Sequence, residues 1–482
     1  MFTPLFFCLF LFCISPLPVV ISRRHNKLAT ATFDVSSSLT KTIQILTTDP
    51  DVASKQALLT GQHQEDKLGN FSLNLHSRDY FFRRENIKDY RSLTLSRLRR
   101  DAARVRYISI RQNLALDKTM RAPVLSGSTQ GSGEYFSRIS IGQPAKSMYM
   151  VLDTGSDVTW IQCQPCYDCY QQADPIYDPT FSSTFSPIPC NSTQCMALRH
   201  PGCLNSGCLY QVSYGDGSYT VGELGTETVR FGDGDGRSVS NVAFGCGHDN
   251  EGLFVGAAGI LGLGGGHLSF PSQISATDFS YCLVDRDSTA TSTLEFASKT
   301  TTDLISSSTD SITAPLLRSK KSDTFYYVNV IGMSVGGHIL SIPSSTFAID
   351  EDGNGGVIID SGTAVTRLHP DAYSQLRQAF SEGTTALPST VGVALFDTCY
   401  DLSSRTSVDV PTIGFVFPEG KVLNLPAKNY IVPVDSLGTF CLAFAPTDQE
   451  SGLSIIGNVQ QQGTRVSFDL AKSRIEFTSD KC

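Results

Sequence analysis

In the segment 149-YMVLDTGS-156 an apolar, strand-like run ends in an acid, a hydroxyl, a glycine and a second hydroxyl. The same order returns in the second half of the chain as 356-GVIIDSGT-363. A glycine allows the backbone to turn tightly and to point its N–H group towards the carboxylate, and the hydroxyls can hold the other carboxylate oxygen. The repeat therefore predicts a pair of aspartates, Asp153 and Asp360, each held by its own loop. The supporting residues are Thr154, Gly155, Ser156, Ser361, Gly362 and Thr363.

Each acid turn is followed by a second repeated element, which consists of two apolar residues and a glycine. In the first half this element is 258-AGILG-262, and Gly262 lies 109 residues after Asp153. In the second half it is 454-SIIG-457, and Gly457 lies 97 residues after Asp360. The similar spacing predicts two related lobes that face each other and contribute one aspartate each.

Length and composition fit a two-domain globular protein that is rich in strands. The 482 residues are too many for one hydrophobic core, and 40% of them are hydrophobic while 17% are charged. The 40 glycines and 22 prolines favour short strands and turns. We predict strands from about residue 133 onwards, a helix at 370–381 and a lobe boundary in the Ser/Thr-rich segment 300–313. The predicted strands include 134–141, 148–153, 208–214, 325–335 and 464–469.

The N-terminus predicts export. Residues 5–20 form an apolar run that contains Pro16 and Pro18 and is too short to span a bilayer comfortably, so residues 1–22 are interpreted as a cleaved signal peptide. Basic residues follow this run instead of preceding it, which leaves a signal anchor as the alternative. The sequence contains no other transmembrane candidate, and the predicted location is the secretory pathway, ending in the extracellular space or an endomembrane compartment.

Positive and negative charge are unevenly divided along the chain. Residues 1–125 carry 19 Lys and Arg against 10 Asp and Glu, a balance of +9, whereas residues 126–482 carry 19 against 36, a balance of −17. The basic segment 93–112 has apolar residues at near-helical spacing and predicts an amphipathic helix. Such a helix could bind nucleic acid or a membrane, or remain a solvated tail, but export and the acidic body favour an intramolecular partner. We therefore interpret residues 23–121, called the leader below, as a basic prosegment that lies over the acidic body.

This charge division suggests that acid releases the leader. Near neutral pH the basic leader should pair with carboxylates of the body. On acidification those carboxylates become protonated, and the pairing weakens. The expectation is a precursor that holds its leader at pH 7 and releases it in acid.

The cysteines indicate a disulfide-bonded protein. Of the 14 cysteines, Cys8 and Cys13 lie in the signal peptide, and an even number in an exported chain is typical of a disulfide framework. The spacing of Cys163, Cys166 and Cys169 would also suit zinc, but export favours disulfides. Glycosylation sequons begin at Asn191 in the body and at Asn70 in the leader.

Other patterns are weaker and predict no cofactor and no metal. Asp350, Asp352 and Asn354 occupy the first three ligand places of a calcium loop, but Ser361 stands where the closing Glu belongs. The glycine-rich segment 262–266 lacks the Lys of a phosphate-binding loop, and the eight histidines show no metal-binding spacing.

Together these motifs resemble the pepsin-like aspartic proteases over roughly residues 133–482. The resemblance rests on both acid motifs, both apolar-apolar-Gly elements, Trp160, and Tyr214 in the segment 214-YGDGS-218. The cysteine-rich insertion after the first acid motif resembles the plant nepenthesin-like branch. Within that branch, residues 245–252 and 454–465 look most like the plant guard-cell aspartic proteases.

The resemblance implies an all-β, bilobal fold with an N-terminal lobe at 122–312, which carries the cysteine-rich insertion, and a C-terminal lobe at 313–482. It implies that Asp153 and Asp360 are catalytic, that Thr154 and Ser361 cross-link the two acid loops, and that Ser156 and Thr363 bond the outer carboxylate oxygens. Tyr214 and Gly215 match the flap that closes over substrate, and Trp160 matches the partner of the flap tyrosine. The implied disulfides are Cys163–Cys166, Cys169–Cys246, Cys190–Cys208, Cys195–Cys203, Cys282–Cys482 and Cys399–Cys441, although sequence alone leaves this connectivity open.

The implied activity is that of an aspartic endopeptidase, made as a secreted zymogen, that hydrolyses polypeptides at acidic pH with a water activated between Asp153 and Asp360. The implied protein is a monomer that is inhibited by its own prosegment and by pepstatin-like inhibitors. It binds no nucleic acid and has no stable membrane span. The alternative is a catalytically silent binding or inhibitor protein, like the plant xylanase inhibitors that share the fold. Loss of either acid would mark that alternative, and both acids are present.

Overall fold

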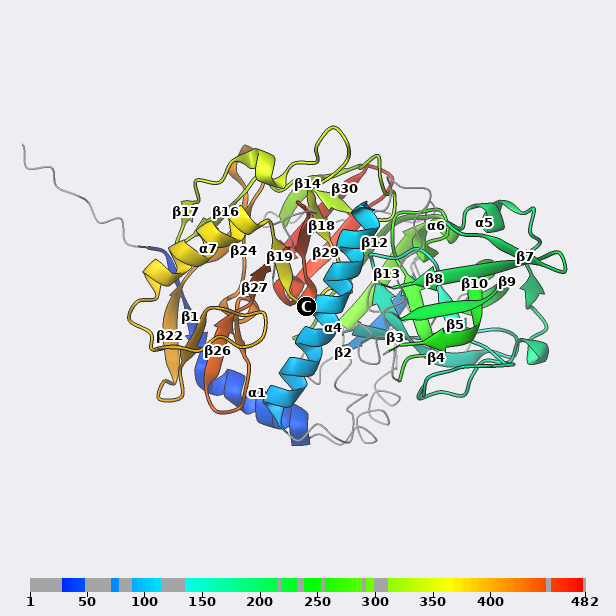
Figure 1. Ribbon diagram of the computed structural model, residues 1–482, viewed down its shortest axis with the longest axis horizontal. Coiled ribbons are helices and arrows are strands. Elements are labelled where there is room, and N and C mark those ends of the chain that lie inside the picture. Colours follow the sequence, from blue (N-terminus) through cyan, green and yellow to red (C-terminus); the bar gives the residue numbers. More distant parts are fainter. Residues whose placement is uncertain are drawn as a thin grey trace, which may run out of the picture.

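The computed structural model describes residues 28–47, 71–77, 89–113, 135–214, 218–231, 238–252, 256–285, 287, 292–298, 311–447 and 452–479. These residues form two β-rich lobes on either side of a long helix, α4 (Tyr90–Asn113), which crosses between them (Figure 1). The all-β, bilobal prediction is confirmed. The predicted signal peptide, the sequon at Asn70, the flap residue Gly215 and Cys482 lie outside the described residues.

The N-terminal lobe, green in Figure 1, is built from antiparallel hairpins, the longest of which joins two extended strands with a shift in register. Long strands with buried residues on one face and turns at their ends suit the many β-branched and aromatic residues of this half. Its strands are β3 (Tyr135–Ile141), β4 (Lys146–Asp153), β5 (Trp160–Gln162), β6 (Ser186–Pro187), β7 (Gly202–Leu204), β8 (Gly207–Ser213), β9 (Tyr219–Arg230), β10 (Ser238–Glu251) and β11 (Gly259–Gly262). Its short helices are η2 (Pro179–Phe181), α5 (Thr193–Met196) and α6 (Phe270–Gln273).

The C-terminal lobe contains shorter strands in several small sheets and one long helix, α7 (Pro370–Gly383), at the predicted position. Its strands are β15 (Tyr327–Val328), β16 (Gly332–Val335), β17 (His338–Ile339), β18 (Val357–Ile359), β19 (Thr366–Leu368), β20 (Ser389–Thr390), β21 (Cys399–Asp401), β22 (Ser407–Pro411), β23 (Ile413–Val416), β24 (Val422–Asn424), β25 (Ile431–Pro433), β26 (Thr439–Leu442), β27 (Phe444–Pro446) and β28 (Ser454–Ile456). Its remaining helices are η3 (Ser344–Phe347), η4 (Pro418–Gly420), η5 (Ala427–Asn429) and α8 (Asn458–Gln461).

The predicted strand 325–335 is wrong as a single element, because the structure divides it into β15 and β16. The N–H group of Val330 donates to the carbonyl oxygen of Val328 over 2.8 Å, which closes a three-residue turn between the two strands. Alternating apolar residues continue through this turn, so the sequence pattern alone did not reveal the break.

The repeated motifs pair with each other within each lobe. The acid strand β4 lies parallel to β11, with Asp153 opposite Gly262. In the second lobe β18 lies parallel to β28, with Ile359 opposite Ile456. In each lobe the apolar-apolar-Gly element is therefore the strand that supports the acid, which accounts for its recurrence at a similar distance.

One antiparallel sheet links the two lobes and includes a strand from the leader. Its order is β14-β30-β29-β12-β13-β2-β3-β4, in which the leader strand β2 (Phe71–Ser77) lies between β13 and β3. The side chains of Leu73 and Leu75 are buried in the main core, so the leader contributes to that core. The strands not yet bounded are β12 (Ala276–Cys282), β13 (Ser292–Ser298), β14 (Ser311–Leu317), β29 (Thr464–Asp469) and β30 (Arg474–Ser479).

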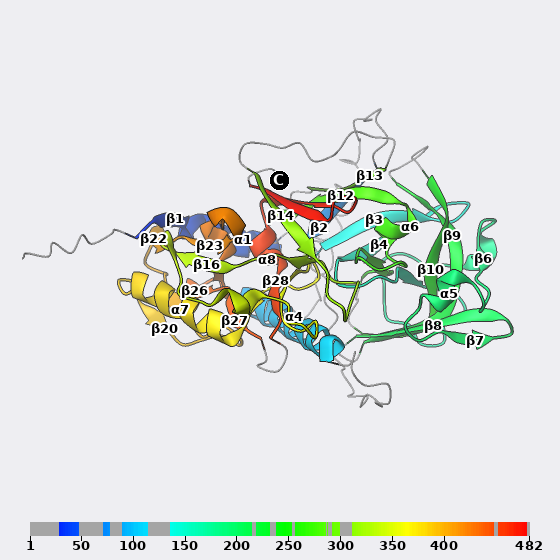
Figure 2. The ribbon, with the colours of Figure 1, turned by 90° about the horizontal axis from the view of Figure 1, so that it is seen from above.

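Three further elements of the leader pack on the C-terminal lobe, as Figure 2 shows from above. Strand β1 (Thr30–Asp34) pairs antiparallel with β22, and helix α1 (Val35–Thr47) follows it. Helix α4 confirms the predicted basic helix, and its Leu98 packs with Val365 and Val434 of the C-terminal lobe. Among the described residues, no helix is long and apolar enough to cross a membrane.

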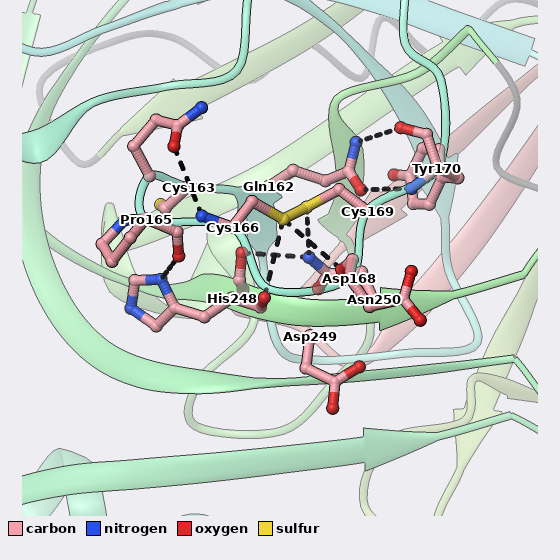
Figure 3. Close-up of a disulfide and its surroundings, with 12 residues drawn as sticks. Gln162, Cys163, Pro165, Cys166, Asp168, Cys169, Tyr170, His248, Asp249 and Asn250 are labelled. Carbon is pink, nitrogen blue, oxygen red and sulfur yellow. Dashed lines mark hydrogen bonds between the residues drawn. A yellow bond between two sulfur atoms is a disulfide. The ribbon is translucent and has the colours of Figure 1, made fainter.

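The disulfides of the cysteine-rich insertion differ from the implied pairs. Figure 3 shows Cys166 bonded to Cys169, next to Gln162 of β5 and Asn250 of β10. Cys163 is bonded to Cys246. The parallel pairing of β5 with β10 places Cys246 opposite Ile161, which is two residues before Cys163, so the two cysteines lie close together. The implied pairs Cys163–Cys166 and Cys169–Cys246 are therefore wrong.

The second pair of disulfides in the insertion is also exchanged. The structure joins Cys190 to Cys203 and Cys195 to Cys208, so the implied pairs Cys190–Cys208 and Cys195–Cys203 are wrong. Cys195 and Cys208 are both buried, whereas Cys190 and Cys203 are more exposed. Each disulfide therefore joins two cysteines of similar solvent exposure. In the C-terminal lobe Cys399 lies opposite Cys441 and is bonded to it, as implied, and Cys282 is also disulfide-bonded.

Candidate active site

The two repeated aspartates lie together at the interface between the lobes, each held by its own loop. Asp153 ends β4 and Asp360 follows β18, and their side chains are 1% and 0% exposed. The N–H group of Gly155 donates to Asp153 Oδ1 over 2.9 Å, and Ser156 Oγ donates to Asp153 Oδ2 over 2.6 Å. Both carboxylate oxygens therefore have donors from the same short loop.

The second acid has the same set of donors. The N–H group of Gly362 donates to Asp360 Oδ1 over 3.0 Å, and Thr363 Oγ1 donates to Asp360 Oδ2 over 2.5 Å. A side chain at Gly362 would lie 2.9 Å from Asp153 Oδ1, so glycine is needed for the close approach of the two loops. The result is an approximate two-fold arrangement of carboxylates and donors.

The remaining hydroxyl of each loop joins the two lobes. The N–H group of Ser361 donates to Thr154 Oγ1 over 2.9 Å, and the N–H group of Thr154 donates to Ser361 Oγ over 3.2 Å. Both residues are buried, so these reciprocal bonds fix one acid loop relative to the other.

A single guanidinium group bridges the two carboxylates. Arg104 of helix α4 donates from Nη1 to Asp153 Oδ2 over 2.8 Å and from Nε to Asp360 Oδ2 over 3.1 Å. Its Nη2 also donates to Oδ1 of both acids, over 3.1 Å to Asp360. The planar fork of arginine suits this geometry, because several N–H groups can reach two carboxylates at once. Arg104 is 5% exposed.

The electrostatics follow from this contact. Burial alone would raise the pKa of Asp153, but the charge of Arg104 and the hydrogen bonds from Arg104, Ser156 and Gly155 outweigh it and hold that pKa below 3.8. Burial lowers the pKa of Arg104, yet the two carboxylates raise it well above its ordinary value. With the leader in place, the site is an ion cluster in which Arg104 is charged.

The same helix makes further ion pairs along its length. Arg97 donates from Nη2 to Asp287 Oδ1 over 3.0 Å, and Tyr90 donates its hydroxyl to Asp287 Oδ2 over 2.6 Å. Asp101 contacts Arg367 and accepts from backbone N–H groups of the C-terminal lobe. These pairs bear out the expectation that the leader helix has an intramolecular partner.

Two aromatic residues that the resemblance assigned to the flap are in contact. Trp160 Nε1 donates to the Tyr214 hydroxyl over 2.7 Å, and both side chains are buried. Asn191, the predicted glycosylation site, is exposed just before helix α5.

If Tyr214 belongs to a flap, as the resemblance implies, replacing it with Phe should lower kcat/KM for a peptide substrate about fivefold, because its hydrogen bond with Trp160, worth about 1 kcal/mol, is lost. The matched control is Tyr430→Phe, which removes a buried hydrogen bond of 3.0 Å to the carbonyl oxygen of Pro411. Both variants should lose a similar free energy of unfolding, and only Tyr214→Phe should lose kcat/KM. Equal kcat/KM in the two variants would contradict a role for this hydroxyl in catalysis.

Both acids and their supporting residues were predicted from the sequence, whereas Arg104, Asp101 and Arg367 were not. A signal for the leader residues was present, because Arg97, Asp101 and Arg104 recur at helical spacing and so share one face of the predicted helix. A buried charged face on a basic helix indicates contact with charged partners. No local pattern identifies Arg367, whose partner is 266 residues away.

Comparisons with known proteins agree with this geometry. Residues 135–298 match the family profile described as "Xylanase inhibitor N-terminal", and residues 325–479 match "Xylanase inhibitor C-terminal". Among solved structures, the chain resembles edgp with a TM-score of 0.62 at 21% identity, covering 86% of this chain and 96% of that one. It resembles soybean basic 7S globulin with a TM-score of 0.58 at 19% identity, covering 86% and 97%. These likenesses show the fold.

Relatives with closer sequences carry protease names. The chain is 50% identical to Aspartyl protease family protein 2 of Arabidopsis thaliana, covering 80% of this chain and 81% of the relative. It is 48% identical to ASPARTIC PROTEASE IN GUARD CELL 2 of the same plant, covering 74% and 75%. It is 41% identical to nepenthesin-2 of Nepenthes gracilis, covering 78% and 83%. The chain therefore belongs to the pepsin-like aspartic protease family, in the plant branch that includes the nepenthesins and the guard-cell proteases.

Proposed function

We propose that this chain is an aspartic endopeptidase made as an inactive precursor, in which the leader helix occupies the catalytic pair. The observation that carries the proposal is the buried, symmetrically held pair Asp153 and Asp360, bridged by Arg104. A pair of carboxylates with this many donors is suited to proton transfer, and a strong internal cation between them is suited to blocking it. Polypeptide substrates fit the family to which the chain belongs.

The chemistry follows from removal of the guanidinium. Two adjacent carboxylates without a cation between them do not both ionise easily, so they share one proton. The ionised carboxylate takes a proton from a bound water as that water attacks a peptide carbonyl carbon, and the protonated carboxyl donates its proton to the carbonyl oxygen. The tetrahedral intermediate then collapses: the carboxyl that took the water proton gives it to the amide nitrogen, the peptide C–N bond breaks and the amine leaves, and the other carboxylate takes back a hydroxyl proton from the intermediate. Asp153 and Asp360 perform these transfers, and the cross-linked loops hold them in position.

The ion pairs of the leader support its role as an intramolecular inhibitor. Helix α4 places Arg104 on the acids, while Lys41 of α1 donates to Asp285 over 2.8 Å. Strand β2 adds main-chain pairing within the central sheet. Disulfides in the body support passage through the secretory pathway, where thiols oxidise.

A catalytically silent binding protein is the second candidate, because the matching family profiles are described by xylanase inhibitors. Both acids and their hydroxyl partners are present and make their hydrogen bonds, which favours the protease. The two candidates differ in one measurement, namely hydrolysis.

The test is an assay of the acid-treated protein on a denatured protein substrate at about pH 3 to 5, with and without pepstatin. We expect hydrolysis that pepstatin abolishes. Complete absence of hydrolysis, with the leader removed and the body folded, would overturn the protease and favour the binding protein. Hydrolysis that pepstatin leaves unchanged would overturn the mechanism.

Release of the leader should occur as the pH falls below 3.8. The pKa of Asp153 lies below that value, and so does the pKa of Asp285, where burial is outweighed by Lys41 and by the N–H group of Asp287. A carboxylate with a lowered pKa stabilises the docked leader fully above its ordinary pKa and loses this contribution as the pH falls through the lowered value. Burial under the helix raises the pKa of Asp101, although the charge of Arg367 and the N–H groups of Val365 and Ala364 favour its carboxylate, so protonation of Asp101 does not drive release.

The measurement follows the size of the chain and its activity after incubation in steps from about pH 7 to pH 2.5. Intact, inactive precursor should persist at about pH 5 and above, and the shorter, active chain should accumulate below 3.8. The switch is contradicted if the precursor keeps its leader equally well at both ends of the range and only an added protease removes it.

A further inference from the structure

The leader helix brings a carboxylate, as well as Arg104, into contact with the body beside the catalytic pair. Asp101 lies one helical turn before Arg104, and its side chain is fully buried against the C-terminal lobe. Its Oδ1 accepts from the N–H groups of Ala364 and Val365 over 2.6 and 3.0 Å. Its Oδ2 accepts from Nη2 of Arg367. The carboxylate of Asp101 therefore has a donor set on both oxygens.

These three donors belong to the body and not to the leader. Ala364 and Val365 directly follow the acid loop that ends at Thr363, and Arg367 lies in β19. The backbone of Arg367 is fixed between two strands, opposite Ala445 of β27 and Ile455 of β28. Arg367 Nη1 also donates to the carbonyl oxygen of Val365 over 3.1 Å, which orients the guanidinium towards the two N–H groups. The donors are therefore set by rigid elements.

Removal of the leader changes what faces these donors. A guanidinium and two N–H groups directed at one point form a carboxylate site, and a buried cation without an anion is unfavourable. Among the described residues, the carboxylate that contacts Arg367 is Asp101. Once α4 has left, an acidic side chain of a bound peptide can take the same place.

We propose that Arg367, with the N–H groups of Ala364 and Val365, is a subsite that selects an aspartate or glutamate side chain in the peptide substrate. This inference rests on the proposed protease function and adds a substrate class to it. Asp101 and Arg104 are three residues apart on a helix, a separation of about 5–6 Å between Cβ atoms. An extended peptide rises about 3.3 Å per residue, so the selected acid lies within a few residues of the scissile bond.

The test uses a peptide series in which Glu is moved one position at a time through the residues on either side of the scissile bond. Each peptide has a partner with Gln at that position, which has the same shape without the charge. At one position the wild-type enzyme should show a kcat/KM about tenfold higher for Glu than for Gln at about pH 5. This ratio should fall at about pH 3, where the glutamate is largely protonated.

The variant is Arg367→Gln, made together with Asp101→Asn so that the precursor contains no unpaired buried charge. Asp101→Asn alone is the matched control, because activation removes that residue and leaves an unaltered body. Its Glu/Gln ratio should equal that of the wild type, and Arg367→Gln should bring the ratio to about one while the Gln peptides are still cleaved. Arg367→Lys should restore part of the preference. Arg377→Gln, on the exposed face of α7 where Arg377 pairs with Asp397, should leave it unchanged.

The outcomes separate this inference from the function on which it rests. If the wild type cleaves the peptides with no preference for Glu at any position, or if the preference survives Arg367→Gln, the subsite is wrong and the protease stands. If the wild type cleaves none of the peptides, the protease and the subsite both fail.

Discussion

Asp153→Asn and Asp360→Asn should each lower hydrolysis of a denatured protein substrate by about a hundredfold to ten-thousandfold. Either change leaves one carboxyl group where the reaction needs a proton acceptor and a proton donor together. An Asn side chain has nearly the shape of Asp: at position 153 its Oδ1 can still accept from the N–H group of Gly155, which lies 2.9 Å from the carboxylate, and its Nδ2 can donate to Ser156 Oγ, which lies at 2.6 Å. The loss therefore reports proton transfer and not collapse of the loop.

The matched control is Asp371→Asn, because that side chain is 81% exposed and lies in the first turn of helix α7. This variant should keep wild-type hydrolysis. Thermal unfolding of all three variants shows whether they are folded. If Asp153→Asn or Asp360→Asn retained full hydrolysis in a folded protein, the assignment of the catalytic pair would be wrong.

The acid pair could be predicted because its information is local and repeated. Each motif contains an apolar strand, an acid and a glycine turn within eight residues, and β4 and β18 place the two acids at equivalent points of their lobes. The supporting strands β11 and β28 were also visible, because an apolar-apolar-Gly element is short and distinctive. The helix predicted at 93–112 was found at Tyr90–Asn113 for the same reason.

The disulfides of the cysteine-rich insertion could not be predicted because their pairing depends on strand register, whereas Cys399–Cys441 is the implied pair. Cys246 meets Cys163 only through the parallel pairing of β5 and β10, two strands that are distant in sequence. A one-residue shift of register would turn these side chains to the opposite face. Cysteine spacing contains no information on that register.

The position of Arg104 was hidden for a related reason. Helix α4 contains several arginines, and periodicity shows which of them share a face but not which one reaches the acids. That choice depends on how far the helix extends between the lobes, which is fixed by two apolar clusters, one containing Leu98 and Val434 and the other Ile108 and Ile455. These contacts join segments that are hundreds of residues apart.

Arg104→Gln should make the precursor active at about pH 5 without acid treatment, with initial hydrolysis a hundredfold or more above the wild-type precursor. The reason is that one guanidinium compensates two buried carboxylates, which contact it at 2.8 to 3.1 Å. Removing one partner from such a cluster costs about 3–5 kcal/mol, and this cost falls on the docked state of the helix. The remaining pairs, Arg97 with Asp287 and Asp101 with Arg367, keep part of the docking energy.

The matched control is Arg99→Gln, which makes the same substitution at an exposed position of the same helix and should leave the precursor inactive at about pH 5. Arg104→Lys should be intermediate, because an ammonium group is a compact charge without the planar fork that reaches both acids. After activation all these variants have the same body and should show equal kcat/KM, which separates an effect on docking from damage to the enzyme. If the Arg104→Gln precursor kept its leader and stayed as inactive as the wild type, inhibition would have to come from coverage by the helix alone, and the guanidinium bridge would be a consequence of docking rather than its cause.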